Sequence, residues 1–241
     1  MTYCVGMKTD LGLIFMSDTR TNAGLDNIST FSKMRTWEVP GERALVLLSA
    51  GNLATTQAVL SILDERDKAP DDRHGSLLHA PSMFQTARFI GNVVKEVIRE
   101  AASSGQNTEW FAATFILGGQ IAGEEPRLFY IYSEGNFIES TTDTPFFQIG
   151  EHKYGKPILI RAYDRTMSFE EASTLLLVSF DSTLKSNLSV GLPLDLQAYR
   201  ADSLRLDPSR RFSRDDPYYA AVSEGWGTAL KSAFRSLPPF R

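Results

Sequence analysis

The two segments that open the chain, residues 2–9 and 11–19, are apolar on both faces of an extended strand. In the first segment one face carries Tyr3, Val5 and Met7, and the other carries Cys4 and Gly6. A short polar turn joins the segments, which predicts an antiparallel hairpin. A strand with one wet face would alternate apolar with polar residues. We therefore expect helices on one face of this hairpin and a second sheet on the other.

Helix caps and hydrophobic periodicity along the rest of the chain predict further groups of strands and helices. Because no linker rich in Pro, Gly or Ser interrupts the sequence, we expect a single domain over residues 1–241. The strands at 137–140 and 146–149 are expected to extend the second sheet, which contains the strands at 111–117 and 128–132. The expected helices span about 52–68, 83–101, 169–187 and 217–237, and the expected strands 33–38, 44–50, 111–117, 128–132, 137–140, 146–149, 190–198 and the region of Arg211.

Composition excludes several classes of partner. The 241 residues are 42% hydrophobic, which is enough to bury a substantial core. Lys and Arg total 25 against 29 Asp and Glu, and this net charge of −4 gives no electrostatic case for nucleic acid or an anionic membrane. No apolar run is long enough to span a bilayer, and the start lacks the features of a signal peptide. The single cysteine, Cys4, cannot form an intramolecular disulfide, so a reducing cytoplasm is the expected location.

The residue that follows the initiator Met has the chemistry of a nucleophile. Removal of Met1 would make Thr2 the N-terminal residue, with a hydroxyl and a free α-amine on the same residue. An α-amine has a pKa of about 7.7–8.0, which suits a general base near neutral pH. By its position alone, Thr2 could equally be an ordinary residue that begins a strand.

Several elements together resemble the proteasome-type β subunits of the N-terminal nucleophile hydrolase superfamily. These elements are the strand that begins at Thr2, Asp18 at the end of the second strand, Lys33 at the start of the third, and Gly51 after the fourth. The resemblance covers essentially the whole chain and is greatest to the bacterial ancestral β subunit, Anbu. The stretches that carry this similarity are residues 17–24, 48–56, 148–151 and 215–218.

The resemblance implies an α+β fold, a four-layer αββα sandwich with two antiparallel sheets between helix layers. It also implies roles for single residues. The Thr2 hydroxyl would attack a carbonyl, its α-amine would take up the proton, and Lys33, paired with Asp18, would supply a fixed positive charge. The backbone N–H of Gly51 would stabilise the oxyanion. Substrate would bind as an extended strand between Asn22 and Gly51.

Two supporting positions depart from the family pattern. Glu151 follows Gly150 where the family has a serine, and Ser186 and Ser189 stand where it has an aspartate and a serine. The resemblance still implies a supporting catalytic role for Ser189, whereas the partner of the α-amine is open. Only Met1 precedes Thr2, so we expect no propeptide.

These observations predict a cytoplasmic, self-assembling threonine-type peptidase or amidohydrolase. Its specificity pocket is expected near Asn22, Phe31 and Leu48. The expected homo-oligomer is a ring or an open helical array. We expect no metal or other cofactor, because the histidines, His74, His79 and His152, do not form a ligand set. Two alternatives are a proteasome-like structural or binding subunit with little activity, and an enzyme of amide or peptide processing in a small biosynthetic pathway.

Overall fold

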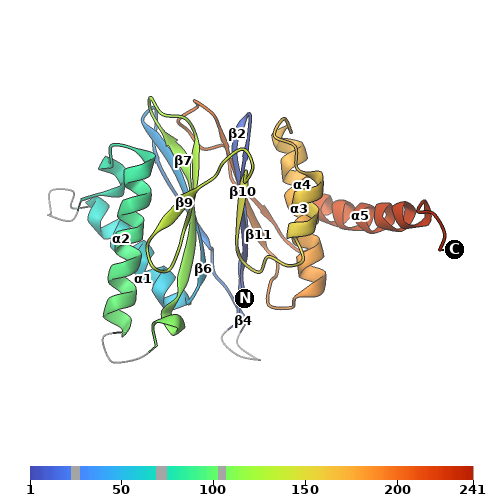
Figure 1. The fold of residues 1–241 in the computed structure, drawn as a ribbon, viewed down its shortest axis with the longest axis horizontal. Helices are drawn as coiled ribbons and strands as arrows, with labels where there is room; N and C mark the ends of the chain where they lie inside the picture. The colour runs from blue at the N-terminus through green and yellow to red at the C-terminus, as the bar shows by residue number, and fades with distance from the viewer. Residues whose placement is uncertain (23–27, 69–74, 103–106, 241) are drawn as a thin grey trace.

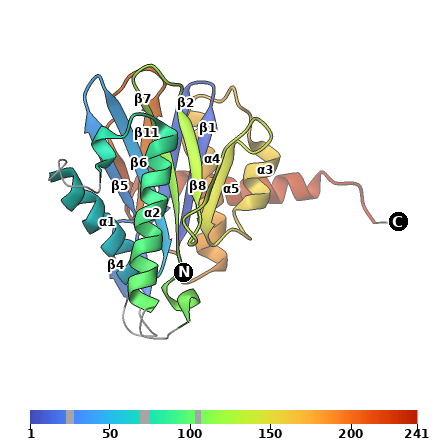
Figure 2. The same cartoon turned by 60° about the vertical axis from the view of Figure 1, so that its left-hand side comes forward.

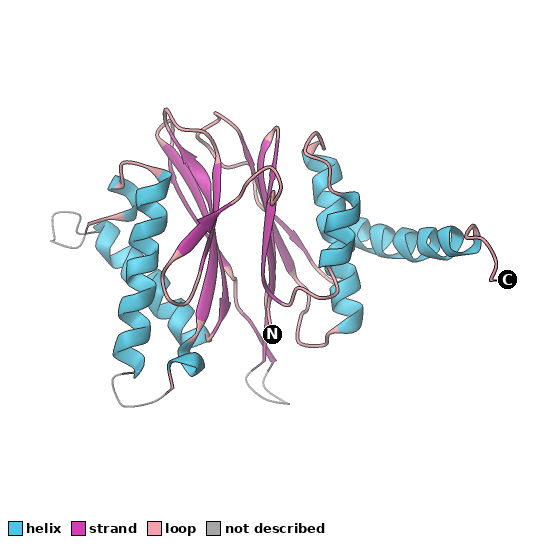
Figure 3. Ribbon diagram, in the orientation of Figure 1, coloured by secondary structure: helices cyan, strands magenta, loops and turns pink. Residues whose placement is uncertain are grey.

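A computed structural model describes residues 1–22, 28–68, 75–102 and 107–240. Within these residues, two five-stranded sheets lie face to face between layers of helices (Figure 3). The strand orders are β10-β1-β2-β11-β12 and β5-β6-β7-β8-β9, and all the pairings are antiparallel. The structure thus confirms the αββα sandwich that the sequence predicts.

The elements have the following bounds. The first sheet consists of β1 (Tyr3–Thr9), β2 (Gly12–Asp18), β10 (Phe146–Gly150), β11 (Leu194–Arg200) and β12 (Arg210–Phe212). The second consists of β5 (Met34–Val39), β6 (Arg43–Gly51), β7 (Ala113–Ile121), β8 (Arg127–Ile131) and β9 (Phe137–Glu139). A separate ribbon pairs β3 (Arg20–Asn22) with β4 (Ile28–Thr30). The helices are α1 (Leu53–Lys68), α2 (Met83–Ala102), α3 (Lys156–Ala162), α4 (Phe169–Ser186) and α5 (Pro217–Arg235), with short 3-10 turns η1 (Leu77–His79) and η2 (Thr108–Phe111).

Three apolar cores hold the layers together. Helices α1 and α2 cover the outer face of the second sheet, and α3 and α4 cover that of the first (Figure 1). The third core lies between the sheets. As expected for the N-terminal hairpin, Val5 packs toward the helices while Cys4 and Phe15 pack toward the other sheet. Every residue of β2 is buried, so the hairpin is a rigid base for the residues at its ends.

The strand expected over 111–117 ends later than predicted, because β7 continues through Gly118 and Gly119 to Ile121. A Cβ on Gly118 would lie 2.5 Å from the Phe15 ring, and one on Gly119 would lie 2.1 Å from the Ala44 carbonyl oxygen. The two glycines therefore let the sheets and neighbouring strands approach closely, rather than reversing the chain.

The expected place of the strand at 146–149 is also wrong. The β10 strand pairs with β1 in the first sheet, in a register that sets Gly150 opposite Tyr3. The partner of an edge strand is a non-local choice that its own sequence does not encode. This pairing brings the segment after β10 beside the start of the chain.

The predicted caps begin three of the long helices. The Asn52 side chain accepts a hydrogen bond from the Thr55 N–H at 3.0 Å, and Ser168 opens α4 with a reciprocal capping box. Asp216 caps α5 through the Tyr219 N–H at 2.9 Å. The short α3 was not predicted, because it has only seven residues and no side-chain cap. No helix in the described ranges is long and apolar enough to cross a membrane.

The apolar stripe expected along the last helix is buried only at its beginning. Tyr219 and Val222 pack against the core beneath α4. Beyond residue 227 every described residue of the chain is exposed, including Phe234 at 76%. The later part of α5 projects away from the sandwich, as Figures 1 and 2 both show.

Candidate active site

A buried ion pair lies directly beneath the start of the chain. The Lys33 ammonium contacts Asp18 Oδ1 at 2.6 Å and donates to the carbonyl oxygen of Arg20, also at 2.6 Å. Lys33 is 7% exposed and Asp18 is fully buried. Asp18 ends β2 and Lys33 precedes β5, so each charge is fixed by the end of a strand. The predicted pair is therefore present.

Backbone donors complete the surroundings of Asp18. The Tyr3 N–H donates to Oδ1 at 2.9 Å, and the Gly191 N–H donates to Oδ2 at 3.2 Å. Burial raises the pKa of Asp18, and the Lys33 ammonium and these two donors oppose that rise. Three hydrogen bonds, one of them from an ammonium, stabilise the charged form of this buried carboxyl.

Thr2 lies one residue before β1, above this pair. Its carbonyl oxygen accepts a hydrogen bond from the Glu151 N–H at 2.6 Å. Gly150 makes that approach possible: its φ is +80°, and a Cβ there would lie 2.0 Å from the Thr2 carbonyl oxygen. The Thr2 hydroxyl forms no hydrogen bond with the described residues. The backbone of Thr2 is thus held by Glu151, directly after β10, while the next residue, Tyr3, is bonded to Asp18 at the end of β2.

Glu151 is nearly buried beside the N-terminus. Its side chain accepts hydrogen bonds from Asn187 Nδ2 at 2.8 Å and from the N–H groups of His152 and Lys153, both at 2.9 Å. Burial alone would raise the pKa of Glu151, but the bonds from Lys153, Asn187 and His152 outweigh burial and lower it. Glu151 is therefore a carboxylate at neutral pH, which adds a second negative charge near the α-amine.

The α-amine of the chain lies within the field of these groups. Burial and the Lys33 ammonium lower the pKa of the Met1 amine, whereas Asp18 and Glu151 act to raise it. An amine with a lowered pKa is neutral in a larger fraction of molecules at neutral pH, and only a neutral amine can accept a proton. The site thus favours the basic form of an amine at this end of the chain.

Gly51 ends β6 at the opposite wall of the site. Its φ is +114°, and a Cβ there would lie 2.3 Å from the carbonyl oxygen of Ala112. A side chain at this position would therefore clash with the neighbouring strand as well as strain the backbone. The glycine is required by the sharp exit from β6 into α1.

Ser189, for which a supporting role is expected, and Ser186, which stands where the family has an aspartate, lie in different surroundings. Ser186 is exposed, and its hydroxyl bonds back to the Ser182 carbonyl of its own helix at 2.8 Å. Ser189 lies in the loop after α4, where its N–H donates to Asn187 Oδ1 at 2.9 Å. The same loop supplies the Gly191 N–H to Asp18, so Ser189 is near the ion pair without touching it.

A cavity of about 530 Å³ opens over Thr2. Its walls combine the ion pair and strand ends with the first turns of α1, where Leu53, Gln57 and Leu60 lie at helical spacing. The cavity is lined by Met1, Thr2, Arg20, Thr21, Phe31, Ser32, Lys33, Ser49, Ala50, Gly51, Asn52, Leu53, Thr56, Gln57, Leu60 and Gly150. A peptide-sized group could therefore reach the Thr2 hydroxyl.

Some expected residues lie elsewhere or outside the description. Leu48 does not line the cavity, because β6 turns it into the core between the sheets. Asn22 ends β3, opposite Ile28, and its side chain is outside the described part of the chain, as are residues 23 and 24 of the motif and His74. Among the described residues, no group of His, Cys, Asp and Glu could hold a metal ion.

Solved structures of similar proteins share this architecture. Anbu from Hyphomicrobium sp. strain MC1 is 51% identical, with both chains fully covered and a TM-score of 0.91. The ancestral beta-subunit Anbu from Yersinia bercovieri is 48% identical over 100% of this chain and 99% of that one, with a TM-score of 0.92. The chain belongs to the Anbu family.

Other comparisons agree with membership of the Anbu family. A structure described as the helical assembly of the Anbu complex from Pseudomonas aeruginosa is 46% identical over 100% of this chain and 98% of that one, with a TM-score of 0.92. A proteasome subunit beta from Haloquadratum walsbyi is 24% identical over 212 residues, which is 88% of this chain and 78% of the relative. No protein-family model matches the chain. This Anbu chain is thus a member of a proteasome-like N-terminal nucleophile hydrolase family.

Sequence reasoning missed several residues of this Anbu site. It did not place Arg20, whose carbonyl oxygen receives the Lys33 ammonium, or Gln57 and Leu60 on the cavity wall. A signal for the α1 residues was present, because residues 53, 57 and 60 form one helical face directly after Gly51. The bond between Asn187 and Glu151 spans 36 positions and has no local signal.

Proposed function

We propose that this Anbu chain is a threonine-type hydrolase of peptide or amide bonds, with Thr2 as its nucleophile after removal of Met1. The observation that carries the proposal is the buried Lys33–Asp18 pair, which adjoins the start of the chain at the floor of an open cavity. A buried ammonium and carboxylate are costly to keep in a merely structural position. Here they instead form the floor beneath a free hydroxyl.

The reaction proceeds in two steps. The Thr2 oxygen attacks the substrate carbonyl carbon while the Thr2 α-amine takes up the hydroxyl proton. Collapse of the tetrahedral intermediate breaks the C–N bond, and the departing nitrogen receives that proton, leaving an ester on Thr2. Water then attacks the ester, the amine again carries its proton, and the acid product leaves with the Thr2 hydroxyl restored.

Three groups would assist this chemistry. Lys33 lowers the energy of the developing alkoxide through its positive charge, and Asp18 keeps that ammonium charged and fixed. The N–H of Gly51 stabilises the oxyanion, a contribution of about 2.7–4 kcal/mol for one such donor in other hydrolases. Ser189 is a positioning residue, whose loop delivers the Gly191 N–H to Asp18.

Substrate would bind as an extended strand between the backbone of Asn22 and that of Gly51. The adjoining cavity wall is neutral at its far end, with Phe31, Leu53 and Leu60 supplying apolar surface and Gln57 a polar group. This lining favours a neutral side chain next to the bond that is cleaved. A bulky basic side chain would lose hydration there and would also meet the positive charges of Arg20 and Lys33, which line the same cavity.

The same proposal covers assembly and location. We place the chain in the cytoplasm as one of many identical subunits, since a relative 46% identical to it is described as a helical assembly. The reaction itself requires no metal or other cofactor.

The first test is the intact mass of the expressed protein before and after incubation with a peptide epoxyketone. This probe needs a free α-amine and a hydroxyl on the same residue to form its adduct. We expect a mass that lacks Met1 and then gains one inhibitor. Retention of Met1, or its loss with no adduct from a series of epoxyketones that vary in their side chains, would contradict the proposal.

Two substitutions of Thr2 sharpen this test. Thr2→Ala removes the nucleophilic oxygen, and we expect no adduct and no hydrolysis with assembly unchanged. Thr2→Ser keeps the oxygen and the amine, so adduct formation is expected to continue. Hydrolysis that survives in Thr2→Ala would exclude this mechanism.

A second candidate function is a structural or binding subunit of a proteasome-like assembly. The observation that favours it is Ser186, which bonds to its own helix rather than supporting the α-amine. In that case the cavity would bind peptides without cleaving them, and wild type and Thr2→Ala would bind equally. A third outcome, transfer of the acyl group to an added amine instead of water, would indicate amide or peptide processing in a biosynthetic pathway.

A further inference from the structure

The last helix is followed by an apolar segment that no other described part of the same subunit covers. The tail, which we define as residues 237–240, follows α5 and contains Leu237 and Phe240 around two prolines. Leu237 is 63% exposed and Phe240 is fully exposed. The first turns of α5 are anchored, since the Tyr219 hydroxyl bonds Asp181 at 3.1 Å. A fixed helix therefore holds the tail out in solvent (Figures 1 and 2).

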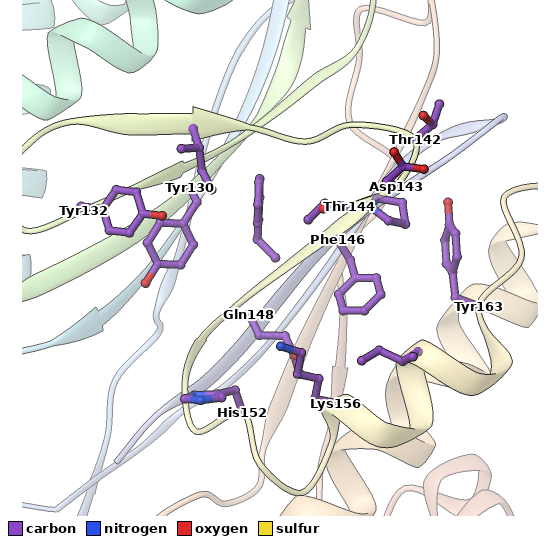
Figure 4. A pocket seen from close by; sticks show the side chains of 14 residues that line it. Tyr130, Tyr132, Thr142, Asp143, Thr144, Phe146, Gln148, His152, Lys156 and Tyr163 are labelled. Carbon is purple, nitrogen blue, oxygen red and sulfur yellow. The ribbon is translucent and has the colours of Figure 1, made fainter.

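A second cavity, distinct from the one over Thr2, is apolar and aromatic. It has a volume of about 660 Å³ and lies where β10, the edge strand of the first sheet, faces α3 and the end of the second sheet. Figure 4 shows Tyr130, Tyr132 and Phe146 around it. Ile138 and Ile160, which also line it, are 45% and 61% exposed. We call this cavity the β10 pocket.

The chemistry of the tail matches that of the β10 pocket. The pair Pro238-Pro239 favours an extended polyproline conformation, and grooves lined by aromatic side chains bind such segments with little loss of entropy. The Tyr132 hydroxyl has no hydrogen-bond partner among the described residues, so it is free to donate to a carbonyl of a proline segment. Flanking apolar side chains of the tail would cover the exposed isoleucines.

Charges at the two surfaces are complementary as well. Asp143 lies at one side of the β10 pocket, away from Lys156 and His152 in Figure 4. Neither Asp143 nor Arg235, the last residue of α5, forms an ion pair within the described ranges. A tail seated in the pocket could bring these opposite charges together, which sets its direction of entry.

The tail points away from the body that carries it, so the β10 pocket that it can reach is that of another copy. From these observations we propose that the tail of one subunit binds in the β10 pocket of the next. The contact joins two different surfaces and is therefore heterologous, which generates rings when the rotation closes and helices when it does not. This inference rests on the proposed assembly of identical subunits and names the surfaces that join them.

A mixing experiment tests the contact. One variant is truncated after Ser236 and lacks the tail; the other carries Ile160→Arg and has a blocked pocket. Sedimentation velocity is expected to show that each variant alone needs at least a tenfold higher concentration to assemble than wild type. An equimolar mixture should form pairs, because the tail of the Ile160→Arg chain can enter the intact pocket of the truncated chain. Trp110→Arg, at an apolar residue that is also exposed but lies outside the pocket, is the matched control.

Cysteine cross-linking reports on the contact itself. Because the native Cys4 is buried, a chain with Phe240→Cys mixed with a chain with Ile160→Cys should form a disulfide-linked pair under mild oxidation. Phe240→Cys mixed with Trp110→Cys should not. The proposed tail contact is wrong if the truncated and Ile160→Arg variants both assemble as wild type does, or if their mixture forms no pairs. Either result leaves the proposed assembly itself intact. A wild type that stays monomeric at all concentrations overturns the proposed assembly too.

Discussion

Replacement of Lys33 by methionine isolates the role of the buried ion pair. The substitution keeps an unbranched side chain that is one atom shorter, but it leaves the fully buried Asp18 carboxylate with only the two backbone donors of Tyr3 and Gly191. Loss of one partner of a buried pair costs about 3–5 kcal/mol, because the remaining charge keeps its desolvation penalty. We expect Lys33→Met to lower the free energy of unfolding by this amount at pH 7.

The loss must depend on pH in a defined direction. Burial raises the pKa of Asp18, and without Lys33 nothing but two N–H groups opposes that rise. A carboxyl whose pKa is higher in the folded than in the unfolded protein destabilises the fold at any pH above its unfolded pKa of about 3.9. This destabilisation grows as the pH rises from the unfolded pKa toward the folded pKa. The difference between Lys33→Met and wild type should therefore be largest near neutral pH and shrink toward pH 4.

Urea unfolding followed by tryptophan fluorescence at several pH values measures this difference. Protein concentration is kept constant, because assembly contributes to apparent stability. The double variant Lys33→Met/Asp18→Asn removes both charges and is expected to recover at least half of the loss, while remaining without activity. A loss below about 1 kcal/mol, or one that does not change with pH, would refute the reasoning that the pair is buried and charged.

Three further predictions follow from single contacts. Gly51→Ala places a Cβ 2.3 Å from the Ala112 carbonyl oxygen at a φ of +114°, so we expect a loss of about 2–4 kcal/mol, visible as a lower melting temperature. Glu151→Gln removes a negative charge that raises the pKa of the α-amine, so the acidic limb of the pH profile of kcat/KM should move to lower pH. An acidic limb that does not move would show that Glu151 does not influence the pKa of the amine. Tyr3→Phe leaves the buried Ser179 hydroxyl without its 2.7 Å partner and should cost about 1–3 kcal/mol in urea unfolding, with Tyr199→Phe as a comparison at another buried hydroxyl.

The parts of the fold that the sequence predicts are those whose cause is local. The apolar residues of each strand in the first hairpin predict its burial on both faces, and Ser168 and Glu171 predict the cap of α4. Asp18, Lys33 and Gly51 are singled out by the resemblance to a known family, and each lies at or next to the end of a strand. Once two sheets face each other, those ends come together at one edge.

Other parts depend on which distant segments meet, and the sequence carries no local record of them. The pairing of β10 with β1 decides that Glu151 lies beside Thr2, yet the strand at 146–149 reads equally well as part of either sheet. The Gly191 N–H reaches Asp18 across 173 positions. Glycine adds a further ambiguity, since Gly118 serves close packing against Phe15 where its residue type also suggests a turn.

The last helix illustrates what periodicity can and cannot establish. Its stripe from Tyr219 to Leu237 predicts that one face of the helix is buried, because apolar residues at helical spacing typically form the face that packs against a core. Within the subunit only Tyr219 and Val222 of that stripe reach a core, while Phe234 and Leu237 stay in solvent. A stripe that continues past its own core is evidence for a surface outside the subunit. The period of the pattern thus predicts burial, and the apolar residues of the stripe that the subunit leaves exposed are where we propose that the next subunit binds.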